Sequence, residues 1–274
     1  MKTTVRLISA TMTIALGLAV SPALAQAEPA QAEEIMSPAE DKHGGRRMFE
    51  RALEALELRP EQQKAVDELK AEAEKRHAPV KAAKRELMTA AADQIEAGKI
   101  DRCALDPQIE KVAAAKDQAH PGDRAAFEKL HSILDKDQRT KFVDALKQGW
   151  ERRQQAHDPT KLADKMAREL GLTEEQKGKV QQILTGLQQI SEALGTHEQH
   201  AEKWSRILEA FKGDRFVLDE IAPAEDVAAM MKRKMMGHLW AAEALMPVLT
   251  KDQRATLAEK LRGKARGHTE TEED

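Results

Sequence analysis

Two short segments of the chain carry side chains that could bind a metal ion. Met231, Met235 and His238 are spaced i, i+4 and i+7, so a helix would place them on one face. Thioether and imidazole groups are ligands for copper, but methionine also suits an adaptable binding surface or a loose core. In the second segment, His197 and His200 at i, i+3 could begin a zinc or nickel site that needs further ligands. We expect a core or a binding surface at the methionines and keep metal binding as an alternative for both segments.

A basic stretch over residues 75–85 offers a different chemistry, the binding of an acidic or unfolded polypeptide. Apolar Val80 lies within the stretch and Leu87 lies just beyond it. Positive charge would attract acidic segments, and the apolar groups would add weak contacts. An ordinary solvated helix face is the alternative. The residues that we expect to contact a bound polypeptide are Arg76, Lys81, Lys84, Arg85, Met231 and Met235.

Four five-residue segments, each beginning with Leu and ending with Gln, have the form of helix starts. Thr173 with Gln176, and Thr250 with Gln253, are spaced as N-cap and N3 of a capping box, in which each side chain bonds the other residue's backbone N–H. Asp135 is a variant of the cap, and Pro60 suits the N1 position of the remaining helix. The segments begin with Leu58, Leu134, Leu172 and Leu249 and end with Gln62, Gln138, Gln176 and Gln253. We expect each leucine to pack beneath the helix that follows it.

The spacing of these segments indicates an internal duplication. The first two begin 76 residues apart and the last two 77 apart, while the first and third are 114 apart. Residues 95–106 also align with residues 208–219 at an offset of 113, with seven of twelve positions identical. We therefore expect two repeats, residues 46–155 and 158–267. The basic stretch has no counterpart in the second repeat, because residues 188–203 are mostly neutral or acidic.

Composition and periodicity favour an all-α fold. The chain is rich in helix-forming residues and only 3% aromatic. We expect four helices per repeat, the second one long, packed as a cradle or elongated bundle that forms an intramolecular pseudo-dimer. Pro79 and Gly195 predict matching kinks in the long helices, and residues 121–122 and Gly237 predict matching breaks in the third helices. The expected helices are residues 46–57, 60–98, 107–133 and 136–154, then 160–170, 174–212, 223–248 and 251–266.

The N-terminal residues have the form of an export signal. Lys2 and Arg6 precede an apolar stretch over residues 7–20, and a small-residue pattern ends at Ala25. We expect a signal peptide over residues 1–25, cleaved after Ala25, then a disordered leader over 26–45 and a disordered tail over 268–274. This predicts a periplasmic protein with no stable membrane insertion. The net charge of −3 argues against a nucleic-acid partner, and the single cysteine, Cys103, excludes an intrachain disulfide framework.

The signal peptide, the helical body and the paired Leu-Thr-x-x-Gln segments resemble the CpxP/Spy family of periplasmic proteins. The match is closest at Leu172-Thr173…Gln176 and Leu249-Thr250…Gln253, whereas the first repeat lacks the threonines. The resemblance implies a small ATP-independent chaperone or an envelope-stress modulator that forms antiparallel homodimers, and related proteins bind metals. This chain departs from the family pattern by carrying two copies.

Two function classes follow from these observations. The first is a periplasmic ATP-independent chaperone or stress adaptor that binds unfolded or misfolded envelope proteins, with a sensor kinase as a further possible partner. The second is a zinc, copper or nickel resistance or sensor protein that uses His197, His200 and His238. We expect no enzyme and no cofactor, because the sequence has no nucleophile elbow, phosphate loop or metalloprotease signature. The protein would be a monomeric pseudo-dimer or a homodimer.

Overall fold

The computed structural model describes residues 44–156, 158–193 and 196–267, and the side chains within them except those of residues 44–47, 153–156, 190–193 and 196–200. The expected signal peptide, nearly all of the leader and the tail lie outside these ranges. The described residues form ten α-helices and no β-strand, which confirms the all-α fold. The helices are α2 (Gly44–Glu54), α3 (Pro60–Ala97), α4 (Arg102–Ile133), α5 (Lys136–Ala156), α6 (Pro159–Leu170), α7 (Glu174–Ala193), α8 (Thr196–Phe211), α9 (Leu218–Ile221), α10 (Val227–Leu245) and α11 (Lys251–Arg266).

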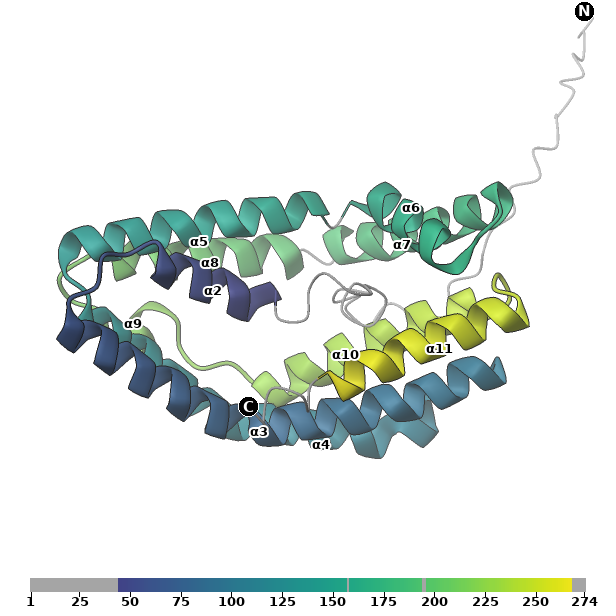
Figure 1. Ribbon diagram of the computed structural model, residues 1–274, viewed down its shortest axis with the longest axis horizontal. Coiled ribbons are helices and arrows are strands. Elements are labelled where there is room, and N and C mark those ends of the chain that lie inside the picture. Colours follow the sequence, from purple (N-terminus) through teal and green to yellow (C-terminus); the bar gives the residue numbers. More distant parts are fainter. Residues whose placement is uncertain (1–43, 157, 194–195, 268–274) are drawn as a thin grey trace, which may run out of the picture.

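The helices form an elongated molecule with two long sides (Figure 1). Helices α3, α4, α10 and α11 run along one side, and α2, α5, α6, α7 and α8 run along the other. The α3–α4 hairpin is therefore continued by helices of the second repeat, because α11 packs on α3 and α10 packs on α4. On the opposite side, α5 of the first repeat packs on α2 and α8.

Local capping explains most of the helix boundaries. The Asp101 side chain accepts a hydrogen bond from the backbone N–H of Ala104, so α4 begins five residues earlier than expected. Asp226 does the same for Ala229 and delays α10 to residue 227. Helix α3 ends at Gly98, where φ is 78°, a conformation that glycine adopts without the steric cost that a Cβ brings.

The kinks and breaks expected at proline and glycine residues are only partly present. Helices α3 and α4 continue through Pro79 and Pro121, and α10 continues through Gly237, so the expected breaks in the third helices are wrong. A buried face carries these helices past residues that weaken a helix by themselves. Helix α3 does change direction part-way along its length (Figure 1). In the second repeat the single long helix is replaced by α7 and α8, and Gly195 lies outside the described residues.

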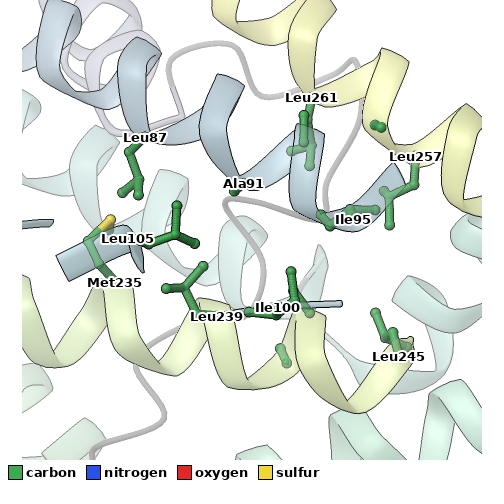
Figure 2. Close-up of a cluster of buried hydrophobic side chains, with 14 of the residues drawn as sticks. Leu87, Ala91, Ile95, Ile100, Leu105, Met235, Leu239, Leu245, Leu257 and Leu261 are labelled. Atoms are coloured by element: carbon green, nitrogen blue, oxygen red, sulfur yellow. The ribbon is translucent and has the colours of Figure 1, made fainter. Parts of the chain in front are cut away.

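The first of two hydrophobic cores is built from aliphatic and methionine side chains. It contains Leu87 of α3, Leu105 of α4, Met235 of α10 and Leu261 of α11 (Figure 2). Side chains of α6 and α7 complete it, including fully buried Val180. The first core thus combines the part of the first repeat where α3 ends and α4 begins with helices α6, α7, α10 and α11 of the second repeat.

The second core contains all five phenylalanines of the chain. The rings of Phe127 on α4 and Phe211 on α8 stack with their centroids 4.7 Å apart. Phe142 of α5 and Phe216, which precedes α9, are also buried there. This core combines α2, α5, the start of α3 and the end of α4, all from the first repeat, with α8 and α9 of the second repeat. Both repeats therefore contribute to both cores.

Ion pairs join the repeats at matching positions. Arg262 on α11 contacts Glu96 on α3 at 2.6 Å, and Lys147 on α5 contacts Glu209 on α8. Arg262 and Lys147 are 115 residues apart, and Glu209 and Glu96 are 113 apart, close to the repeat offset. Exposed pairs of this kind stabilise a fold by only about 0–1 kcal/mol. These two ion pairs show that equivalent positions of the two repeats contact each other in the same way on both sides of the molecule.

Candidate functional site

The glutamines that end the Leu…Gln segments do more than cap their own helices. The side-chain amides of Gln62 and Gln138 bond each other in both directions, at 2.8 and 3.1 Å. Gln176 and Gln253 form the same reciprocal pair at 2.8 and 3.0 Å. Each amide oxygen also accepts the backbone N–H of its own N-cap residue. Each repeat therefore ties the starts of two helices together through one amide pair.

The second N–H of each amide is used in an equally regular way. Gln62 donates to the carbonyl of Ile133, and Gln138 donates to the carbonyl of Glu57. In the second repeat, Gln176 and Gln253 donate to the carbonyls of Val248 and Gly171. Every acceptor lies two residues before the partner's N-cap, so each glutamine also fixes the turn that leads into the partner's helix.

The capping residues behave in two ways. Asp135, Thr173 and Thr250 each accept the backbone N–H of the glutamine three residues later, which completes three capping boxes. Arg59 stands at the first N-cap and has no acceptor atom, so only the glutamine half of that box is formed. Leu134 and Leu249 are buried in the cores, whereas Leu58 and Leu172 are half-buried against them.

The basic stretch lies in the middle of α3, where it faces α4. His77, Lys81 and Lys84 follow at i, i+4 and i+7, so they lie along one side of the helix. All of the expected contact residues of this stretch are half-buried rather than fully exposed, namely Arg76, Lys81, Lys84 and Arg85. Lys81 is held at 2.5 Å by Glu74 of the same helix. Neighbouring Val80 is buried, so the charged side lies next to an apolar one.

Asp123 on α4 is the centre of a network that the sequence did not reveal. Its carboxylate accepts hydrogen bonds from Arg76 at 2.9 Å and His77 at 2.8 Å on one oxygen, and from Lys116 at 2.8 Å on the other. Burial by itself raises the pKa of Asp123, but the bonds from His77, Lys116 and Arg76 outweigh it and lower the pKa well below its usual value of 3.8. The carboxylate is therefore ionised at neutral pH.

A glycine makes this network possible. A Cβ on Gly122 would lie 2.5 Å from the Arg76 Cδ, closer than two carbon atoms can approach. The absence of a side chain at Gly122 leaves room for the Arg76 side chain, which reaches the adjacent carboxylate of Asp123. The only local signal in the sequence was the Pro-Gly pair that precedes Asp123, which marks a helix irregularity and not an ion pair.

Arg124 and His120 lie near the same network on α4. The Arg124 side chain is only 14% exposed, and it contacts Asp219 at 2.5 Å and the Ala222 carbonyl at 2.8 Å, both from the second repeat. The pKa of His120 is lowered by burial and by the nearby charges of Arg124 and Lys116. A histidine that is harder to protonate is the response expected in positive surroundings.

The methionine segment belongs to the core. Met231 and Met235 are 8% and 4% exposed and pack in the first core, where Met235 lies beside Leu105 (Figure 2). Of the two expected roles for these methionines, a core or a binding surface, the structure places both residues in a core. His238 is 1% exposed on the same helix. The side chains of His197 and His200 lie outside the described residues.

Neither a metal site nor a membrane span is found among the described residues. No group of three or more His, Cys, Asp or Glu side chains in these ranges is arranged to hold a metal ion. No helix in the described ranges is both long and apolar enough to cross a membrane. Cys103 is exposed at the start of α4 and forms no disulfide.

The comparison with known families matches the first repeat. Residues 43–146 match the model of the LTXXQ motif family protein. This family includes the CpxP/Spy-like periplasmic proteins, so the resemblance expected from the Leu…Gln segments is confirmed. No curated protein and no solved structure matches the chain.

Proposed function

Because its first repeat belongs to the LTXXQ motif family, we propose that this protein is a periplasmic chaperone that binds unfolded envelope proteins without ATP. Family membership supports a stress-related or metal-resistance-related protein of the periplasm. The observation that favours the chaperone is the half-buried basic side of the α3–α4 hairpin. It combines lysine and arginine side chains from two helices with apolar neighbours, which suits weak binding of many sequences rather than one ligand.

The arrangement supports binding and not catalysis. An active site needs a nucleophile or base, an orienting group and a site for the reacting atom in one pocket. The side chains gathered around Asp123 are Arg76, His77 and Lys116, which donate to one carboxylate, and the set includes no Ser, Thr or Cys nucleophile. LTXXQ family proteins are generally non-enzymatic, which agrees with this assignment.

The proposal is tested by light scattering from an unfolded protein that aggregates, in metal-free buffer without ATP. The chain from residue 26 onwards should suppress scattering at about one chaperone per client. A variant with Lys81, Lys84 and Arg85 changed to Gln should suppress it less. The matched control changes three exposed lysines elsewhere, Lys99, Lys141 and Lys251, to Gln and alters the net charge by the same amount.

The outcomes separate the candidate functions. Equal loss in both triple variants would show a general charge effect and contradict the proposed face. No suppression by the wild type would reject the chaperone function. The same sample would then be titrated with zinc and copper, and stoichiometric uptake that is lost in a His197→Ala, His200→Ala variant would identify the metal-binding alternative.

A further inference from the structure

One carboxylate on the basic side of the hairpin is surrounded by three donors that all point to it. Arg76, His77 and Lys116 contact Asp123 at 2.8 to 2.9 Å. The four side chains are between 20% and 30% exposed, so the network is sheltered and still reaches solvent. A carboxylate that accepts three charge-assisted or polar hydrogen bonds is bound as an acidic ligand would be.

The charges of this network do not cancel. Arg76 and Lys116 are cations at neutral pH and Asp123 is the one anion that they share. The site therefore keeps a positive charge after Asp123 is counted. Burial is the largest cause of the lowered pKa of His120. Arg124 and Lys116 lower this pKa further, while Asp123 and Asp117 act in the opposite direction.

The second repeat lacks this network. The repeat offset of 113 to 115 carries Arg76, Lys116 and Asp123 onto residues 189–191, 229–231 and 236–238, which include no Asp, Glu, Lys or Arg. In the last two of these stretches the second repeat uses buried Met231 and His238. An apolar core is often as stable as a sheltered ion network or more so. Stability alone therefore does not account for the charged groups of the first repeat.

We propose that Asp123 is an internal competitor, whose carboxylate occupies the position that a carboxylate of an acidic client segment takes among Arg76, His77 and Lys116. The inference rests on the proposed function and specifies its clients as unfolded segments rich in Asp and Glu. Such a segment must displace Asp123 before it gains the three donors. The exchange of one carboxylate for another keeps the affinity low, which allows a client to leave without ATP.

The test uses Asp123→Asn in the chain from residue 26 onwards. The probe is an unfolded 20-residue peptide of alternating Glu, Ser and Leu. Its Kd is measured by isothermal titration calorimetry at about 0.15 M salt, where the Debye length is about 8 Å. Removal of the competitor should lower the Kd by about three- to tenfold, the range expected when one charged contact is gained. A peptide with Gln in place of Glu should bind the variant and the wild type equally.

Glu86→Gln is the matched control. Glu86 is an exposed residue of the same hairpin, where it pairs with Lys111 at 2.7 Å, and its change alters the net charge by the same amount. Its Kd for the acidic peptide should stay within about twofold of the wild type, because general electrostatic attraction is screened. Equal tightening in both variants, or no tightening in Asp123→Asn, would overturn the proposal. Adding Arg76→Gln to Asp123→Asn should abolish the gain.

A second measurement covers the case in which Asp123→Asn does not fold. The carboxyl carbon resonance of Asp123 in the wild type should shift as acidic peptide is added, because the donors leave it. An unchanged resonance at saturation would overturn the competitor role.

Aggregation assays distinguish this proposal from the proposed function. A wild type that suppresses aggregation without showing this shift retains the chaperone function alone. A wild type that suppresses no aggregation loses the chaperone function, whatever the peptide result.

Discussion

The side-chain amides of Gln62 and Gln138, 76 residues apart, are bonded to each other in both directions. Gln176 and Gln253, 77 residues apart, repeat the contact. Each pair joins the starts of two helices, α3 with α5 and α7 with α11. The glutamine of the Leu…Gln segment is therefore a link between two helix starts, and the leucine anchors that link to a core.

Replacement of Gln138 by Ala should destabilise the protein more than replacement of an exposed polar residue does. It leaves the Asp135 N–H, the Glu57 carbonyl and one side of the Gln62 amide without their partners. A sheltered polar group without a partner costs about 1–3 kcal/mol, but the Asp135 and Glu57 groups are only part-buried and water can partly replace their bonds. The free energy of unfolding should therefore fall by about 2–3 kcal/mol in total in a urea titration. Gln63→Ala is the control, because Gln63 is exposed and bonds only Asp67 in the next turn. A similar loss in both variants would contradict the role of the amide pair.

If the chain is cut between the repeats, the two fragments should remain associated. Both cores combine helices from both repeats, so neither repeat alone buries its apolar side chains. A protease site inserted at residues 157–158, between α5 and α6, would allow the cut. The two fragments should co-elute in size-exclusion chromatography at the size of the uncut chain. Separate elution of two folded fragments would contradict an intramolecular pseudo-dimer.

Gly122→Ala should fail to give the stability gain that a helical Gly→Ala change normally brings. The new Cβ would force Arg76 away and weaken its bond to Asp123. Gly178→Ala is the matched control, because nothing lies within 4 Å of a Cβ at that helical position. The control should raise the free energy of unfolding by about 0.5–1 kcal/mol. Equal gains at both positions would show that Arg76 is not held as described.

The contribution of Asp123 to stability should depend on pH in one direction. Its pKa is lowered in the folded state, so the folded protein favours the ionised form. The stabilisation is then fully present above the unfolded pKa and is lost as the pH falls below it. The difference in unfolding free energy between the wild type and Asp123→Asn should therefore shrink below about pH 4. If the difference in unfolding free energy instead grew as the pH fell, Asp123 would not be stabilised in its ionised form by this network.

Local sequence signals determined much of this protein. Helix α11 begins and ends where its capping box and spacing predicted, and α5, α6 and the starts of α3 and α7 agree within two residues. A cap acts over three residues and needs no tertiary contact, so it can be read directly from the chain. The internal duplication is likewise predicted from the sequence alone, by the spacing of the Leu…Gln segments.

Tertiary structure decided which helices meet and therefore what the site contains. Arg262 meets Asp93 across 169 residues, and Arg76 meets Asp123 across 47, contacts that no local pattern specifies. The spacing of Met231 and Met235 favoured a core or a binding surface over a ligand set but did not separate the first two. The packing of α10 on α4 placed both residues in the core. Helix propensity and capping are short-range, so most helix starts follow from the local sequence. Burial depends on the fold as a whole, so only the packing of the helices decides which face of each one is buried.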